Sequence, residues 1–127
     1  MIRGVGVDAV SISEIKRYME IFGDPFINRT FTEKEVVVSR LSSRPEEYLA
    51  TRFASKEAVF KAIAHFTKRK LFDFRVVETL NEPDGYPVVQ MKGELLNLAK
   101  EAGITAIHVT MTTEKDFATA FVVAESV

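Results

Sequence analysis

The sequence predicts an α+β fold, with mainly antiparallel sheet and with its helices segregated from its strands along the chain. The predicted elements follow the order β-α-α-α-β-β-α-β-β, and the strands of the second half are joined by short turns, as in hairpins. The length of 127 residues, with 46% hydrophobic and 28% charged residues, is typical of one globular domain. We therefore expect a single domain that spans residues 1–127.

A first strand is predicted at residues 2–10, and its two faces differ. Alternation puts apolar residues on one face and small or acidic residues on the other: Val5, Val7 and Ala9 against Gly4, Gly6 and Asp8. The two glycines leave room for another group to approach the backbone closely. Because Asp is disfavoured inside strands, we interpret Asp8 either as a hydrogen-bonding residue near the strand end or as a functional carboxylate.

Capping boxes predict the starts of the next two helices, at Ser11 and at Thr32. The first helix is expected over residues 11–22, ending at a glycine, and the second over residues 32–41. Between them, Asp24-Pro25 is expected to begin an irregular segment.

The main helix is predicted over residues 46–66, a long run without Gly or Pro whose apolar residues form one broad arc. Lys56 falls inside that arc, while Glu57 and Lys61 are neighbours at its edge. Each has an ordinary explanation: a lysine stem that extends to water, and an exposed ion pair between residues four apart. A functional interpretation needs evidence from elsewhere in the chain.

The second half is predicted as two hairpins separated by a helix that ends at Gly103. The expected strands cover residues 73–80, 87–91, 104–113 and 116–125, and the expected helix covers residues 94–102. His108 shares a face with Ile104 and Ala106, which favours a histidine buried in the core. Lys68, Arg69 and Lys70 form a basic cluster at the end of the main helix, where cations complement the helix dipole.

Composition excludes several classes of function. The net charge of −1 gives no reason to expect nucleic acid or an anionic membrane as a partner. The sequence has no cysteine and only two histidines, so disulfides, zinc thiolates and a histidine-based metal site are not expected. No signal peptide or membrane span is recognisable, and we expect a cytoplasmic protein.

Four motifs, spread in order over nearly the whole chain, carry a family resemblance. They are Gly4-Val5-Gly6-Val7-Asp8, Phe31-Thr32-Glu33-Lys34-Glu35, the segment from Arg52 to Ala62, and Gly85-Tyr86-Pro87. In these motifs the chain resembles the holo-acyl-carrier-protein synthases, the small phosphopantetheinyl transferases of bacterial fatty-acid synthesis.

The resemblance implies a 4′-phosphopantetheinyl transferase-like fold and a Mg²⁺-dependent reaction. The 4′-phosphopantetheine arm of coenzyme A would move to a serine of an apo acyl carrier protein, releasing adenosine 3′,5′-bisphosphate. It also implies a homotrimer with active sites between subunits.

The resemblance further implies roles for five residues. Asp8 and Glu57 would bind Mg²⁺, which agrees with the preference of this ion for one or two carboxylates plus waters and phosphates. Glu57 would also accept the proton of the incoming serine, and Lys61 would contact the phosphates. Lys56 and Arg52 would be further phosphate contacts.

The chain departs from the family on the coenzyme side of the expected site. The family motif Ser-x-Ser-His corresponds to residues 110–113, where the hydroxyls of Thr110 and Thr112 remain as phosphate donors but Thr113 replaces the histidine. The family motif Gly-Thr-Gly is replaced within residues 64–67, and the basic cluster at 68–70 is a candidate to hold the 3′-phosphate instead.

The chain also departs on the partner side, because Glu14 stands where the family usually has an arginine that faces the acidic carrier protein. Two hypotheses follow. One is an active transferase, and the alternative is a degenerate family member that binds coenzyme or partner as a trimer without efficient transfer.

Overall fold

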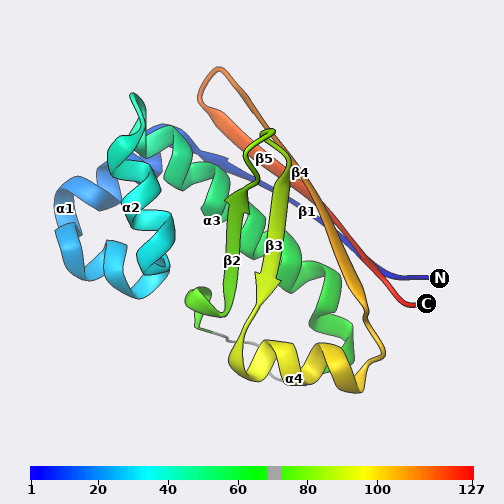
Figure 1. The fold of residues 1–127 in the computed structure, drawn as a ribbon. Helices are drawn as coiled ribbons and strands as arrows, with labels where there is room; N and C mark the ends of the chain where they lie inside the picture. Colours follow the sequence, from blue (N-terminus) through cyan, green and yellow to red (C-terminus); the bar gives the residue numbers. More distant parts are fainter. Residues whose placement is uncertain (69–72) are drawn as a thin grey trace.

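The computed structural model describes residues 1–68 and 73–127 (Figure 1). The predicted order of helices and strands is confirmed, with two short 3₁₀ helices added. The elements are β1 (Ile2–Ser11), α1 (Ile12–Thr30), α2 (Glu33–Leu41), α3 (Pro45–Ile63), η1 (Ala64–Phe66), η2 (Phe74–Val76), β2 (Val77–Asn81), β3 (Pro87–Met91), α4 (Gly93–Glu101), β4 (Ala106–Glu114) and β5 (Phe117–Glu125). Two members of the basic cluster, Arg69 and Lys70, lie outside the described residues.

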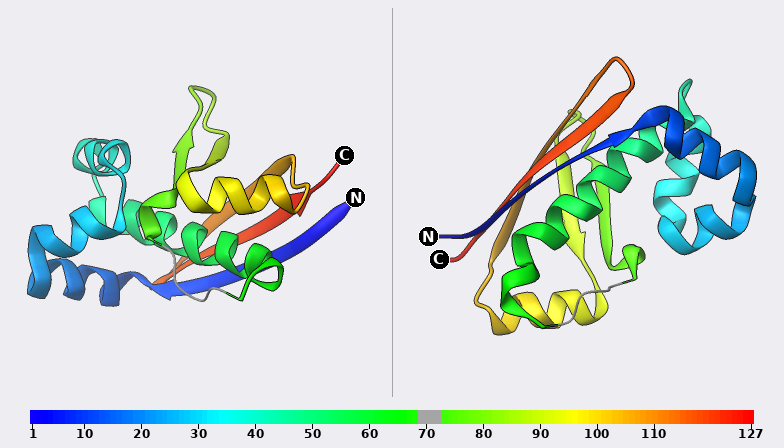
Figure 2. Two further views of the ribbon diagram at one scale, coloured as in Figure 1. Left: turned by 90° about the horizontal axis from the view of Figure 1, so that it is seen from below. Right: turned by 180° about the vertical axis from the view of Figure 1, so that it is seen from behind.

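The strands form two antiparallel sheets, which confirms the predicted α+β class. One sheet has the order β1-β5-β4, so the first strand pairs with the last, and the other is the β2-β3 hairpin. Because β3 lies beside β4, the two sheets together wrap around α3, with α1 and α2 at one end of this helix and α4 at the other (Figure 2). The long central helix therefore positions most of the fold.

Small residues allow α3 to lie directly on β1. A Cβ atom at Gly6 would be 2.0 Å from the carbonyl oxygen of Ala58, and one at Gly4 would be 2.0 Å from that of Ala62. Only hydrogen fits at these two positions, so the room predicted from the glycines is filled by the backbone of α3 itself. Asp8 shares this strand face and is consequently directed toward the helix.

The opposite face of the same sheet is uncovered in the protomer. Val5, Val7, Phe117 and Phe121 on this face are each 44–56% exposed. His108 also lies on it, exposed and 3.1 Å from a Glu125 carboxylate oxygen, so the prediction of a buried histidine is wrong. The alternation of apolar residues along β1 was predicted correctly, but the apolar face of this strand does not face the core.

Both helices begin at the predicted caps, although only the cap at Thr32 is a complete capping box, and one helix boundary is wrong. The Ser11 hydroxyl accepts a hydrogen bond from the Glu14 amide, and Thr32 and Glu35 form a complete capping box. The segment after Gly23 is not irregular, because the chain kinks there at φ 62° and continues as helix to Thr30. Among the described helices, none is long and apolar enough to cross a membrane.

Candidate functional site

The contact between β1 and α3 brings together three residues that the sequence predicts at one site. Lys61, in the last turn of α3, places its Nζ 3.0 Å from Asp8 Oδ1 and 3.0 Å from the carbonyl oxygen of Val7. The Asp8 side chain is mostly covered, whereas that of Lys61 is 54% exposed. Lys61 can therefore reach solvent or a ligand from the same backbone position.

Glu57 lies one turn before Lys61 and is half-buried. Burial raises the pKa of its carboxyl group, the negative charge of Asp8 raises it further, and the Lys61 ammonium opposes both effects. The negative charge of Asp8 thus acts on Glu57 across the contact of β1 with α3. A cation placed between them would relieve this repulsion.

The donor set fits Mg²⁺ better than an ion that requires a closed protein site. Within residues 1–68 and 73–127, no group of three or more His, Cys, Asp or Glu side chains is arranged to hold a metal ion. Asp8 and Glu57 supply two carboxylates, and Mg²⁺ commonly takes its remaining ligands from water and substrate phosphates. The residues present therefore suit an ion that is completed by a phosphate ligand.

Lys56 is not part of this site, and its predicted phosphate contact is corrected. Its side chain is fully buried, with Nζ 2.7 Å from Glu35 Oε1 and a further hydrogen bond donated to the carbonyl oxygen of Val77. Burial lowers the pKa of this ammonium, while Glu35 and then Glu78 raise it. The lysine joins α3 to α2 and β2, and no coenzyme phosphate can reach it in this structure.

Arg52 is likewise held inside the protomer rather than beside Asp8. It is 4% exposed, and its guanidinium donates hydrogen bonds to the carbonyl oxygen of Thr79 and to the side chains of Thr51 and Asn81. It also stacks on Tyr48, 4.0 Å from the ring centroid. The predicted phosphate contact is therefore not supported, because the donors of Arg52 are used to attach β2 to α3.

The threonines of β4 lie away from Asp8. Thr110 and Thr112 are exposed on the uncovered face of the sheet, whereas Asp8 is on the covered face. Thr113 faces the other way and lines a shallow pocket of about 320 Å³ with Arg44, Tyr48 and other residues: Ser42, Ser43, Glu47 and Thr51. Sequence reasoning missed this pocket because residues 42–51 and Thr113 are far apart along the chain.

Glu14, the predicted docking residue, is exposed in the first turn of α1. Its carboxylate accepts a hydrogen bond of 2.7 Å from the hydroxyl of Tyr18. On the same helix, Ile21 and Phe22 are 63% and 52% exposed, so apolar side chains are available on this surface.

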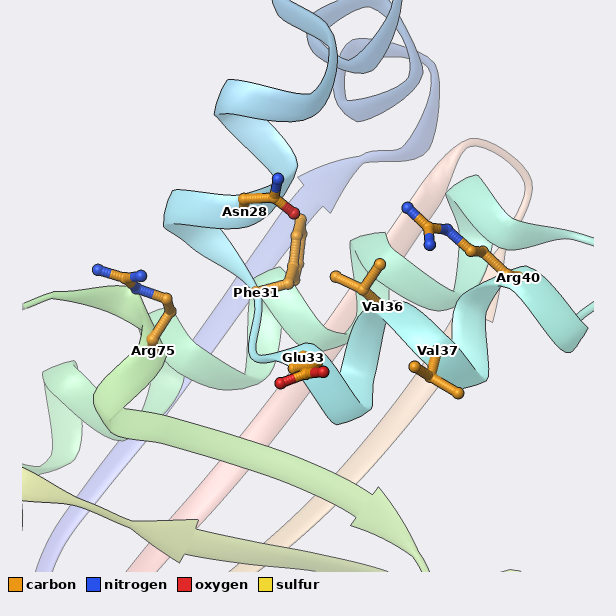
Figure 3. A pocket seen from close by; sticks show the side chains of 7 residues that line it. All are labelled: Asn28, Phe31, Glu33, Val36, Val37, Arg40 and Arg75. Carbon is orange, nitrogen blue, oxygen red and sulfur yellow. The ribbon is translucent and has the colours of Figure 1, made fainter.

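A further pocket, of about 340 Å³, lies beside α2 (Figure 3). Its lining comes from the end of α1, from α2 and from η2: Asn28, Phe31, Glu33, Val36, Val37, Arg40 and Arg75. Among the described residues, none of those that the sequence predicts at the functional site lines it. It is therefore separate from the Asp8, Glu57 and Lys61 site.

Comparisons with known proteins identify the family of this chain. A family model described as the 4′-phosphopantetheinyl transferase superfamily matches residues 4–122. A holo-[acyl-carrier-protein] synthase of Halothermothrix orenii is 38% identical over 125 residues, which cover 98% of this chain and 98% of that protein. The crystal structure of the holo-[acyl-carrier-protein] synthase from Neisseria meningitidis has 34% identity and a TM-score of 0.88, covering 99% of this chain and all of that one.

A holo-(acyl-carrier-protein) synthase from Bacillus anthracis, solved in complex with CoA (3′,5′-ADP), has 30% identity and a TM-score of 0.78, covering 100% and 99% of the two chains. These matches first define a class, that of the phosphopantetheinyl transferases. The chain belongs to the holo-[acyl-carrier-protein] synthase family of that superfamily, and it is a transferase.

Proposed function

We propose that this protein transfers the 4′-phosphopantetheine group of coenzyme A to a serine of an apo acyl carrier protein and releases adenosine 3′,5′-bisphosphate. The observation that carries the proposal is the grouping of Asp8, Glu57 and Lys61 at the contact of β1 with α3. The relatives' names, and the coenzyme bound in the Bacillus anthracis protein, support the choice of substrates.

Each of the three residues has a distinct role in the proposal. Asp8 and Glu57 hold Mg²⁺, which supplies positive charge for the phosphates of coenzyme A. Glu57 accepts the proton of the incoming serine. Lys61 exchanges its contact with Asp8 for a contact with the substrate phosphates and with the departing bisphosphate.

We further propose a homotrimer with its active sites between protomers. The uncovered face of the sheet is apolar, with Val5, Val7 and Phe121 exposed, as is typical of a surface that another subunit covers. Asp8 is on the covered face of the sheet, whereas Thr110 and Thr112 are exposed on the uncovered face. With another protomer over the uncovered face, a substrate that contacted both sets of residues would lie between two protomers. Lys56 gives no support for the trimer, because this lysine is already paired within one protomer.

The carrier protein is proposed to dock on α1, where Glu14, Ile21 and Phe22 are exposed. Exposed Lys16 and Arg17 on this helix suit an acidic partner, whereas Glu14 opposes it.

The test is incubation of the protein with coenzyme A, Mg²⁺ and a panel of apo carrier proteins. Intact mass spectrometry then measures whether each carrier protein has gained the phosphopantetheine group. Asp8→Ala and Glu57→Ala are each expected to lose most of the activity. A lost metal ligand reduces the stabilisation of charge in the transition state, typically by several kcal/mol. Removal of divalent cations by a chelator is expected to do the same. The matched control Glu101→Gln removes an exposed carboxylate on α4 and keeps normal activity.

Normal rates for either alanine variant would refute the site assignment. Coenzyme binding without transfer to any carrier would instead support a degenerate member that binds without catalysing.

A further inference from the structure

The loop between β4 and β5 is joined to the first turn of α1 by one residue, Asp116. Its Oδ1 accepts a hydrogen bond of 2.9 Å from the Ser13 amide, and its Oδ2 accepts hydrogen bonds of 2.7 Å from the hydroxyls of Ser11 and Ser13. Its main-chain carbonyl oxygen accepts another, also of 2.7 Å, from the Ile12 amide. One residue of a hairpin loop thus holds the start of a helix that lies about a hundred residues earlier in the chain.

These contacts satisfy the free donors at the start of α1. The Ile12 and Ser13 amides donate to Asp116, and the Glu14 amide donates to the Ser11 hydroxyl. Such amides have no partner within their own helix, and the helix dipole favours a negative charge beside them. The hydrogen bonds from Ser13, and then from Ser11, lower the pKa of the Asp116 carboxyl group. The group is therefore charged at neutral pH, and its hydrogen bonds are charge-assisted.

The residue before Asp116 has an unfavourable backbone conformation. Lys115 has a φ of 55°, and it is the only non-glycine residue with positive φ in the described part of the chain. Two-residue hairpin loops usually place Gly, Asn or Asp at such a position. A strained residue persists where its surroundings determine its conformation, and the contacts of Asp116 with α1 are surroundings of this kind.

The start of α1 is directly continuous with the strand that carries Asp8. The strand β1 ends at Ser11 and α1 begins with the next residue, so no loop separates them. Farther along, α1 is held by apolar packing, for example through Ile15, which is 2% exposed in a buried cluster. Apolar contacts are non-directional, whereas hydrogen bonds have preferred angles. The hydrogen bonds of Asp116 therefore fix the direction in which α1 leaves β1.

We propose that Asp116 is a positioning residue for the carrier protein, because it fixes the docking helix α1 relative to Asp8 and Glu57. The inference rests on the proposed function, in which the carrier docks on α1. Asp116 itself would contact neither substrate. Its effect comes from preorganisation, since a docking surface that must be ordered on binding loses affinity.

The experiment measures transfer kinetics at saturating coenzyme A and Mg²⁺ while the concentration of apo carrier protein is varied. Asp116→Ala is expected to raise the KM for the carrier about 3- to 10-fold, with kcat changed less than about twofold, because the first turn of α1 is then less ordered before binding. The dissociation constant of coenzyme A, measured by titration calorimetry, should stay within about twofold, since Asp8 and Lys61 are held by the contact of β1 with α3.

Conservative variants separate position from charge. In Asp116→Asn the amide oxygen can still accept from the Ser13 amide, and its NH₂ group can donate to the serine hydroxyls, so the KM should return to within about twofold of the unchanged protein. Ser13→Ala removes one of the hydrogen bonds and should raise the KM by a smaller factor than Asp116→Ala.

The matched control is Asp84→Ala, in the loop of the other hairpin, where the carboxylate accepts from the Tyr86 amide of its own turn. It should leave the KM unchanged. The contacts of Asp116 lie at the surface, so all these variants should remain folded. Thermal melting and light scattering verify that fold and assembly are the same.

A KM that rises in neither Asp116→Ala nor Ser13→Ala would overturn this inference and leave the proposed function standing. Equal changes in Asp116→Ala and Asp116→Asn would also overturn it, because the charge of Asp116 and not the position of α1 would then act on the carrier. A lack of transfer to any carrier by the unchanged protein would overturn the proposed function itself.

Discussion

Asp8 and Glu57 are the two residues whose properties depend most directly on each other. The raised pKa of Glu57 has burial as its largest cause and the charge of Asp8 as its second. Removing that charge in Asp8→Asn should lower the pKa of Glu57 in the metal-free protein, leaving the effect of burial. An NMR titration of the Glu57 side-chain carboxyl in both proteins measures this change, with Asp84→Asn as a control in an exposed turn.

The same shift has a consequence for stability, with a definite sign. Because the folded pKa of Glu57 is above its unfolded value, folding favours the protonated form. Stability from this group is therefore present below the unfolded pKa and is lost as the pH rises through the folded pKa. Asp8→Asn should show a smaller loss across that interval, and an unchanged pKa of Glu57 would contradict close coupling of the two carboxylates.

The charge of Glu14 should affect how fast the carrier protein associates with the enzyme. Glu14→Arg should raise the rate of transfer to an acidic carrier severalfold at low salt, because reversal of a rim charge mainly changes association. The gain should shrink at higher salt, since surface charges are screened within about 10 Å at 0.1 M. Steady-state kinetics at several salt concentrations measure it.

Glu14→Gln is the matched control, since it removes the charge but keeps an acceptor for the Tyr18 hydroxyl. It should give an intermediate rate. No gain for the arginine variant at low salt would mean that the first turn of α1 does not face the partner.

At the scale of whole elements, α2, α3 and β2 are joined by one buried ionic group. Glu35 accepts hydrogen bonds from Lys56 Nζ, from the Thr32 amide and from the Thr79 amide. Glu35→Leu should lower the free energy of unfolding by about 3–5 kcal/mol, because it leaves the Lys56 ammonium buried without its counter-ion. Urea denaturation measures the loss.

Glu35→Leu combined with Lys56→Met should recover much of that stability, since no unpaired charge then remains. By contrast, Arg44→Ala breaks an exposed ion pair with Glu47 and should cost less than about 1 kcal/mol. A double variant no more stable than Glu35→Leu would show that the amide contacts of Glu35, and not its pairing with Lys56, carry the effect.

For the molecule as a whole, the uncovered sheet face should determine the oligomeric state. Light scattering is expected to give a trimer at micromolar concentration. Val7→Glu or Phe121→Glu should produce folded monomers, because a charge on an apolar interface is costly to bury. Val37→Glu places the same charge on an exposed position of α2 and should leave the trimer intact; a monomeric unchanged protein would contradict the proposal.

Patterns within short segments were readable from the sequence, and pairings between distant segments were not. The caps at Ser11 and Thr32, the glycines of β1 and the grouping of Asp8 with Glu57 and Lys61 were predicted from local motifs or from the family resemblance. Lys56 was misplaced because α3 is buried on two sides, by β1 and β5 and by β2, whereas periodicity suggested one apolar arc.

Arg52 was misjudged for a related reason. Two of its acceptors, Thr79 and Asn81, lie 27 and 29 residues further along the chain on β2, and no pattern near Arg52 predicts them. The exposed placement of Thr110 and Thr112 depends on the register of β4 with β5, which the sequence of β4 does not specify alone.

Gly4 and Gly6 bring the backbone of β1 into direct contact with α3, so the reactive groups are held by a rigid part of the fold. The same two contacts that seat α3 on β1 also set how far Asp8 stands from Glu57 and Lys61. Enzymes whose reactive groups sit on loops can lose activity on mild heating while the fold persists. Here the reactive groups are spaced by the central packing contact, so thermal inactivation and thermal melting are expected to occur as a single event.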